Sequence, residues 1–200
     1  MSKQTQEAAV KPPKAPLSID PRYIGRLVGI LTGICLVTAL LLGIVNQVTK
    51  PRIDAIQKAK MEAAMAQVLP ADEYEEIDMD AAHVDALYKA TTGGSFVGYV
   101  AETSTSGSQG TIQLMVGIDP EGKVTGVSVV KHSETPNIGT KVVADQSVLD
   151  RFIGMSHESG EITVNAGTNR FDGVTGATYS SKGVAAGVNA ALDAASGPAA

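Results

Sequence analysis

Several hydroxyl side chains lie close together near the end of the chain, in the segment FDGVTGATYSSKGV at residues 171–184. Ser180 and Ser181 precede a regular apolar pattern, so we expect one of them to cap the N-terminus of a helix. A helix N-terminus also presents free N–H groups and a positive potential, which together favour a phosphate group. The small residues before it, Gly173, Gly176 and Ala177, leave the backbone accessible to a ligand or an enzyme. The segment is interpreted as either a plain capped turn or a phosphate site.

A second candidate cluster is KHSETPNIGTKV, residues 131–142, which follows a predicted strand. Pro136 forces an extended conformation on Thr135, and Gly139 supplies a further turn. His132 and Glu134 could form an acid–base pair, although no nucleophile lies near them in the sequence. The other interpretations are a simple surface turn and a rigid loop that packs against a flat ligand. Of the two functional readings, the rigid loop fits the sequence better.

The segment DGVTGATYSS resembles the flavinylation motif of the FMN-binding subunits of Rnf complexes and of Na⁺-translocating NADH:quinone reductases. In that family a D-x-x-[ST]-G-A-T signature receives FMN through a phosphoester bond to its last threonine. The signature here consists of Asp172, Thr175, Gly176, Ala177 and Thr178.

The second cluster resembles another motif of the same family, a loop with the pattern HxETPGLG. Residues 132–139 match this pattern, except that Asn137 stands where the family usually has glycine. Asparagine tolerates a positive φ better than most residues, so the shape of the loop can be kept. The resemblance extends over residues 22–196, and the length of the chain favours the Rnf G-type subunit.

The resemblance implies a role for each motif residue. Thr178 would carry the covalent FMN, and Asp172 would be recognised by the enzyme that attaches it. The remaining cofactor contacts fall into two groups. Those expected around the isoalloxazine ring or the ribityl chain are Glu134, Thr135, Ile138 and Gly139. Those expected near the phosphate or giving access to it are Thr175, Gly176, Ala177 and Ser180.

The resemblance also implies a function. The chain would relay electrons in an Rnf-type ion-translocating ferredoxin:NAD⁺ oxidoreductase, together with other redox and membrane subunits. An FAD-dependent FMN transferase would mature it, and the C-terminal domain would lie on the extracytoplasmic side of the inner membrane. The alternatives are the equivalent subunit of a Na⁺-translocating NADH:quinone reductase and a membrane-anchored binding or assembly module without redox chemistry.

The elements that must position these residues begin with an apolar run, LVGILTGICLVTALLLGIV, at residues 27–45. These 19 residues carry no charge and are long enough to cross a bilayer as a helix. We predict a disordered tail at 1–20, a transmembrane helix at 22–48, and a helix starting at Pro51 within a connector at 51–80. Lysine and arginine flank the span almost equally, so charge alone does not predict its orientation.

The rest of the chain predicts an α+β domain at residues 81–200, with an antiparallel sheet and flanking helices. Strands are expected at 95–102, 112–118, 123–132 and 162–164, and a Gly/Ser-rich loop at 104–110. Helices are expected at 146–153 and from about residue 184 onward. The acidic stretch at 72–80 is expected to be a solvated loop, to which we assign no metal.

Composition narrows the possible functions. The formal net charge is −5, which provides no basic surface for nucleic acid. The single cysteine, Cys35, lies inside the apolar run and cannot form an internal disulfide. No zinc-ligand spacing, Walker motif or dinucleotide-binding fingerprint is present, so iron–sulfur and nicotinamide sites would have to belong to partner subunits.

Overall fold

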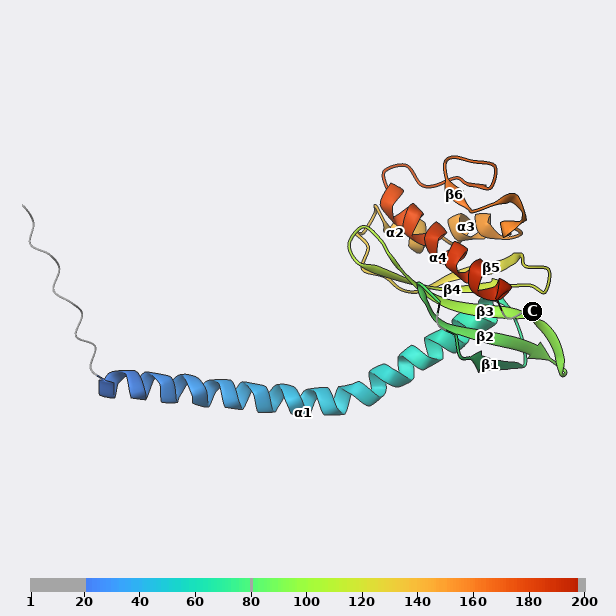
Figure 1. Ribbon diagram of the computed structural model, residues 1–200. Helices are drawn as coiled ribbons and strands as arrows, with labels where there is room; N and C mark the ends of the chain where they lie inside the picture. The colour runs from blue at the N-terminus through green and yellow to red at the C-terminus, as the bar shows by residue number, and fades with distance from the viewer. Residues whose placement is uncertain (1–20, 80, 198–200) are drawn as a thin grey trace, which may run out of the picture. The chain divides into compact units, whose positions relative to one another are not determined.

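The computed structural model describes residues 21–79 and 81–197 (Figure 1). The predicted disordered tail at 1–20 lies outside the described residues. The chain divides into two compact units, Met1–Ile53 and Asp54–Ala200, which are described separately. The domain limits suggested by the sequence, with the FMN-binding domain starting at residue 81, stay a prediction.

Helix α1 (Pro21–Val68) is 48 residues long, and its first part has the length and apolar composition needed to cross a membrane. The side chains of this apolar part are exposed, with Leu36 and Leu42 at 66% and 71%. The prediction of a separate helix beginning at Pro51 is wrong, because Pro51 lies inside α1. Its ring removes one backbone hydrogen bond, but residues on both sides keep helical geometry.

The C-terminal end of α1 packs against one face of a sheet. Met65 and Val68 are buried there against Val100 and Met115. The hydroxyl of Thr125 donates to the carbonyl oxygen of Val68 at 2.6 Å, which satisfies a carbonyl that the helix leaves free. This end of α1 therefore forms part of the folded domain.

The sheet has five antiparallel strands in sequence order (Figure 1). They are β1 (Glu73–Ile77), β2 (Val84–Thr92), β3 (Ser95–Ser106), β4 (Thr111–Ile118) and β5 (Val124–Lys131). The acidic stretch expected to be a loop contributes β1, so that prediction is wrong. Glu73 pairs with Thr91 and Ile77 with Leu87. Acidic side chains suit an edge strand, because they discourage further strand pairing.

Strand β3 is longer than predicted. The Gly/Ser-rich segment was expected to be a loop from residue 104, but Ser104 pairs with Gln113 and Ser106 with Thr111. Only the remainder of that segment turns between β3 and β4. The extra length brings the end of β3 beside the first turns of the last helix, where the hydroxyl of Thr105 donates to the carbonyl of Gly183 at 2.8 Å.

Helix α4 (Thr178–Ser196) covers the other face of the sheet (Figure 1). Val184 and Val188 are fully buried with Leu114 and Val116, so this layer is the main core. A Cβ atom on Gly187 would lie 2.5 Å from Cδ1 of Leu114, so glycine is required for this close packing. The predicted α+β class, with an antiparallel sheet and flanking helices, is confirmed.

Short elements complete the domain. The predicted helix at 146–153 consists of α3 (Gln146–Leu149) followed by a 3-10 turn, η1 (Asp150–Phe152). The remaining elements are α2 (Thr140–Val143), the 3-10 turn η2 (His157–Ser159), β6 (Thr163–Val164) and β7 (Arg170–Phe171). Strands β6 and β7 pair in parallel, and β7 leads into the turn before α4.

Candidate functional site

The two sequence motifs meet at the N-terminus of α4. The loop after β5 and the first turn of α4 line one shallow depression of about 50 Å³. Most of the residues expected to contact FMN line it. The full lining consists of Ser108, Glu134, Thr135, Ile138, Gly139, Gly176, Ala177, Thr178, Tyr179 and Ser180. Ser108 and Tyr179 belong to this site although the sequence reasoning missed them.

Thr178 is the first residue of α4, and its side chain is exposed. Ala177 occupies the N-cap position, so the expectation that Ser180 or Ser181 caps the helix is wrong. The helix starts earlier because Gly176 adopts a φ of +83° and turns the chain into it. Thr178 therefore presents its hydroxyl at the start of the first helical turn.

Free N–H groups accompany that hydroxyl. The N–H of Ser181 donates to the carbonyl of Ala177 at 2.9 Å and starts the helical hydrogen-bond ladder. The N–H groups of Thr178, Tyr179 and Ser180 precede it and have no carbonyl one turn back in the helix. They form the positive end of the helix dipole, which is suited to an anion.

The two serines fix the turn instead of capping the helix. Both side chains are buried, at 1% exposure for Ser180 and 0% for Ser181. The hydroxyl oxygen of Ser181 accepts from the N–H of Val174 at 3.2 Å. A Cβ atom on Gly173 would lie 3.0 Å from that same hydroxyl oxygen, so a small residue is needed beside it. These contacts hold the residues immediately before Thr178 in one conformation.

Asp172 and Thr175, the other signature residues, are both exposed and do not line the depression. The carboxylate of Asp172 pairs with Nη2 of Arg170 at 2.7 Å. Its carbonyl oxygen accepts from Nη1 of Arg151 at 2.8 Å. Asp172 is thus held at the surface ahead of the turn, where another protein can reach it.

Glu134 joins three segments through its buried carboxylate. Oε2 accepts from the hydroxyl of Ser180 at 2.5 Å, in the first turn of α4. Oε1 accepts from the N–H of Ser108 at 2.8 Å and from that of Gln109 at 3.3 Å. Glu134 is only 5% exposed, so its oxygens are used within the protein. This arrangement ties the loop after β3 and the loop after β5 to the helix that carries Thr178.

The loop after β5 has a defined shape. The carbonyl oxygen of Thr135 accepts from the N–H groups of Ile138 and Thr140, each at 3.3 Å. Asn137 has a φ of +62°, and its N–H donates to the hydroxyl of Thr140 at 2.8 Å. Asparagine therefore adopts here the left-handed conformation for which the related motif uses glycine. The Ile138 side chain is left 53% exposed at the rim of the depression.

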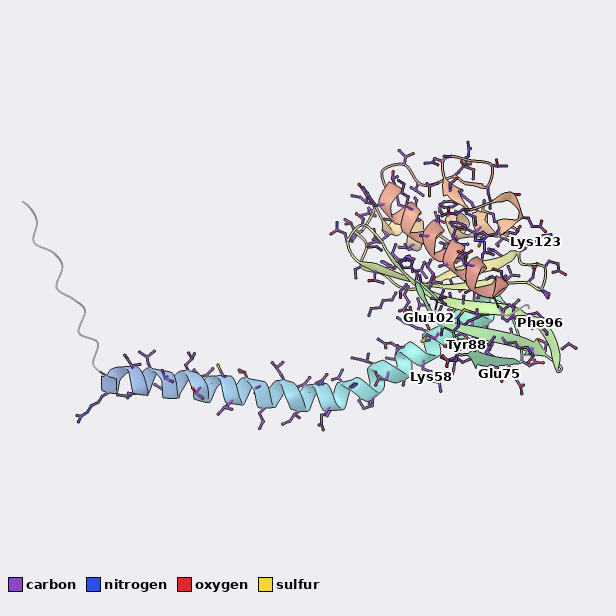
Figure 2. All side chains as sticks on the ribbon, viewed as in Figure 1. Lys58, Glu75, Tyr88, Phe96, Glu102 and Lys123 are labelled. Carbon is purple, nitrogen blue, oxygen red and sulfur yellow. The ribbon has the colours of Figure 1, made fainter. Side chains whose placement is uncertain are left out.

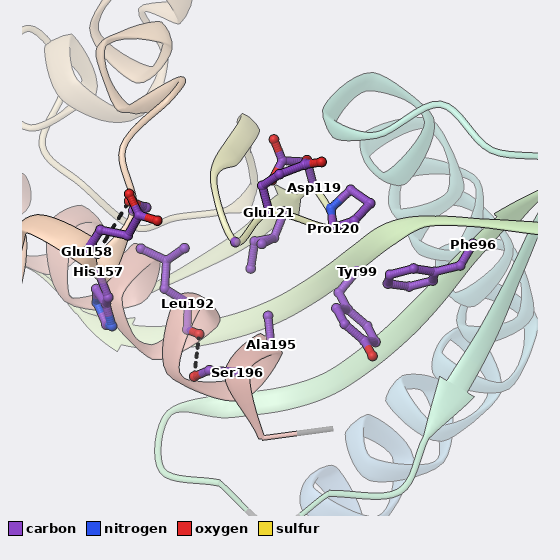
Figure 3. Close-up of a pocket in the computed structure, with 13 residues that line it drawn as sticks. Phe96, Tyr99, Asp119, Pro120, Glu121, His157, Glu158, Leu192, Ala195 and Ser196 are labelled. Carbon is purple, nitrogen blue, oxygen red and sulfur yellow. Dashed lines mark hydrogen bonds between the residues drawn. The ribbon is translucent and has the colours of Figure 1, made fainter. Parts of the chain in front are cut away.

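A larger cavity lies elsewhere, at the C-terminal end of α4 (Figure 3). It measures about 420 Å³, and its walls include Tyr99, Leu192 and Ala195. Asp119 and Glu121 from the β4–β5 turn lie on its rim (Figure 3). Neither sequence motif contributes to it. Cavity size therefore does not distinguish the site that the two motifs form.

Glu102 is a second buried acid, on the α1 side of the sheet near Tyr88 (Figure 2). Its Oε1 accepts from Nε2 of Gln113 at 2.6 Å. Burial raises the pKa of Glu102, and the nearby carboxylates of Asp85 and Glu76 raise it further. Burial also raises the pKa of Tyr88, with Glu102 and Glu76 adding to the effect. These groups do not contact the Thr178 depression.

The residues at the depression fit the phosphate end of FMN. The depression combines an exposed hydroxyl with free N–H groups at the start of a helix. It also has open space around Gly176, where an added Cβ would meet nothing within 4 Å. Thr178 could hold the phosphate covalently, and the N–H groups of Tyr179 and Ser180 could stabilise its charge. Within the described residues no group of His, Cys, Asp and Glu is suited to hold a metal ion.

Comparisons with known proteins identify the family of this chain. The family model described as "FMN-binding domain" matches residues 107–193, and the one described as "RnfG N-terminal region" matches residues 22–68. The G subunit of the ion-translocating oxidoreductase complex of Methanosarcina acetivorans is 32% identical over 87% of this chain and 95% of its own length.

Two further relatives are also G subunits. That of the Na⁺-translocating ferredoxin:NAD⁺ oxidoreductase complex of Acetobacterium woodii is 31% identical, covering 90% of this chain and 95% of its own length. That of the ion-translocating oxidoreductase complex of Haemophilus influenzae strain PittEE is 30% identical, covering 84% of this chain and 86% of its own. The chain therefore belongs to the RnfG family, the G subunits of ion-translocating oxidoreductase complexes.

Proposed function

We propose that this chain is a membrane-anchored electron carrier of an Rnf-type complex, with FMN bound through a phosphoester to Thr178. One observation carries the proposal: the exposed hydroxyl of Thr178 begins α4, and the Glu134 loop is tied to the same helical turn. Family membership supports a role as one subunit of a larger oxidoreductase complex. FMN supplies one- and two-electron redox chemistry when bound. The protein would bind and orient the FMN and determine the polarity around it.

A covalent attachment would hold the cofactor at a depression that is too small to enclose it. A depression of about 50 Å³ is far smaller than the roughly 300–1,000 Å³ typical of sites that enclose a small molecule. Such a surface cannot retain a cofactor by burial. A phosphoester bond at Thr178 keeps it in place while leaving its ring accessible to partner subunits.

Attachment requires a separate transferase. Threonine is a weak nucleophile, and within the depression no basic side chain lies beside Thr178 to activate it. We therefore assign activation to an FAD-dependent FMN transferase and its metal. The Thr178 oxygen would attack the phosphorus next to the riboflavin moiety of FAD, AMP would leave, and the threonine proton would be released. Gly176 and Ala177 give the enzyme access, and the exposed Asp172 is a recognition residue.

The N-terminal part of α1 would anchor the chain, with the C-terminal domain on the extracytoplasmic side. A cysteine-accessibility experiment tests this orientation. In a Cys35→Ser background, single cysteines at the exposed positions Gln109 and Glu121 should react with a membrane-impermeant maleimide on intact cells. Reaction only after the membrane has been permeabilised would refute the outward orientation.

Covalent flavin can be tested directly by co-expression with an FMN transferase. The full chain should retain flavin fluorescence in a denaturing gel and should gain mass equal to one FMN minus water. Thr178→Val should lose both signals with its thermal unfolding unchanged, whereas the matched control Thr168→Val, at an exposed threonine outside both motifs, should keep both. Wild-type chain without covalent flavin under these conditions would refute the electron-carrier proposal.

A further inference from the structure

Exposed apolar side chains gather around the Thr178 depression. Beyond α1, the structure records only four large apolar side chains in the described residues as exposed. Two of them, Ile138 and Tyr179, line this depression, at 53% and 73% exposure. The other two are Phe96 and Ile153. Large apolar groups exposed together at one site indicate a surface that is covered by something else.

The two side chains come from different segments that line the site. Tyr179 follows Thr178 directly in the first turn of α4. Ile138 lies in the loop after β5, and its N–H is held by the carbonyl of Thr135. Because Glu134 ties this loop to Ser180, the two segments are fixed relative to each other. The aromatic ring and the branched aliphatic group therefore belong to the same depression as the exposed Thr178 hydroxyl.

We propose that Tyr179 is the aromatic partner of the isoalloxazine ring and packs against it beside Ile138, whose place near the ring the family resemblance already implies. This inference rests on the proposed function. The depression is too small to enclose a flavin, so the ring must lie at its mouth, where these two side chains are. A planar aromatic ring packs favourably against tyrosine and excludes water from both surfaces. The hydroxyl of Tyr179 makes no hydrogen bond within the described residues, so this side chain is not needed to hold the fold.

The test uses full-length holoprotein, purified in detergent after co-expression with the transferase. Tyr179→Leu, Tyr179→Phe and Ile153→Ala are compared with wild type. Ile153 is the matched control because its side chain is 51% exposed but does not line the depression. Mass spectrometry first establishes how much covalent flavin each variant carries, and only the fluorescence per bound flavin is then compared.

A tyrosine phenol in contact with a flavin ring quenches its fluorescence. Tyr179→Leu should therefore gain fluorescence per flavin and become more accessible to quenching by iodide. Tyr179→Phe should keep the low iodide accessibility, because its ring still covers the flavin, and Ile153→Ala should match wild type. Equal fluorescence and equal iodide accessibility in Tyr179→Leu and wild type, both fully loaded, would overturn this inference alone. Absence of covalent flavin in wild type would instead refute the proposed function.

Discussion

Replacing Gly139 by alanine tests how closely the loop after β5 fits around Glu134. The added Cβ would lie 2.2 Å from Oε2 of Glu134, 2.8 Å from its Cβ and 2.9 Å from Oγ of Ser180. Side-chain atoms do not approach one another this closely, so the Glu134–Ser180 hydrogen bond must move or break. The substitution is therefore expected to destabilise the domain.

The expected size of the effect is a balance of two opposing terms. Gly139 has φ −65° and ψ −32°, an ordinary helical conformation, so alanine adds no backbone strain. In such a conformation, glycine to alanine would by itself stabilise the fold by about 0.4–1 kcal/mol. Overpacking a closed site costs about 1–3 kcal/mol. The net loss should be roughly 1–2 kcal/mol, which corresponds to a fall in Tm of about 2–8 °C for a chain of this size.

Thermal unfolding of the full chain in detergent, followed by circular dichroism, measures this loss. Gly197→Ala is the matched control, because Gly197 also has helical angles and its nearest new contact would be an ordinary 3.5 Å. In a Glu134→Ala background, Gly139→Ala should cost clearly less, since its main obstacle is gone. A Gly139→Ala variant as stable as Gly197→Ala would refute the proposed tight packing around the carboxylate.

Two further predictions concern buried polar groups away from the depression. Glu102→Gln should be more stable than wild type at neutral pH, because burial and the carboxylates of Asp85 and Glu76 raise the pKa of Glu102 in the folded state. Wild type is stabilised while Glu102 is protonated, and it should lose that stabilisation as pH rises from below 4.5, the ordinary pKa, through the raised pKa of the folded state. Urea unfolding should therefore show the difference in stability between Glu102→Gln and wild type disappearing near pH 4. A difference that does not depend on pH would contradict the raised pKa. In wild type, Oδ1 of Asn189 accepts from the N–H of Ile162 at 3.0 Å, and Nδ2 of Asn189 donates to the carbonyl of Ile162 at 2.9 Å. Asn189→Ala leaves both backbone groups unpaired, so it should lower the free energy of unfolding by about 2–4 kcal/mol in the same assay. A loss below about 0.5 kcal/mol would show that water replaces the amide there.

The sequence predicts much of this fold because its strongest signals are local. The uncharged run at residues 27–45 and the period-two alternation at 112–118 need no tertiary information, and both elements appear as expected. The acidic stretch was misread because β1 depends on pairing with β2, which exists only in the folded chain. Pro51 was misread for a related reason: a proline inside a helix and one that starts a helix look alike in sequence.

At the candidate site, the motifs identified the right segments but not the contacts between them. Nothing in the sequence shows that Glu134 reaches Ser180, 46 positions away, or that Ser108 donates to the same carboxylate. The serines were expected to cap α4 because they immediately precede its apolar pattern. In the structure Gly176 turns the chain so that α4 begins at Thr178, three residues earlier than a Ser180 cap would require. Tyr179 could have been noticed as an aromatic residue in an otherwise small and polar turn.

The proposed phosphoester joins FMN to one particular oxygen atom, that of the Thr178 hydroxyl. Trypsin cleavage after Arg170 and Lys182 releases the peptide spanning residues 171–182, which contains Thr175, Thr178, Ser180 and Ser181. Fragmentation of this peptide from transferase-treated protein should place the FMN mass on Thr178, the only one of these four hydroxyls in the first helical position. An FMN-bearing fragment that excludes Thr178, or an unmodified peptide from protein that was correctly folded and exposed to active transferase, would contradict it.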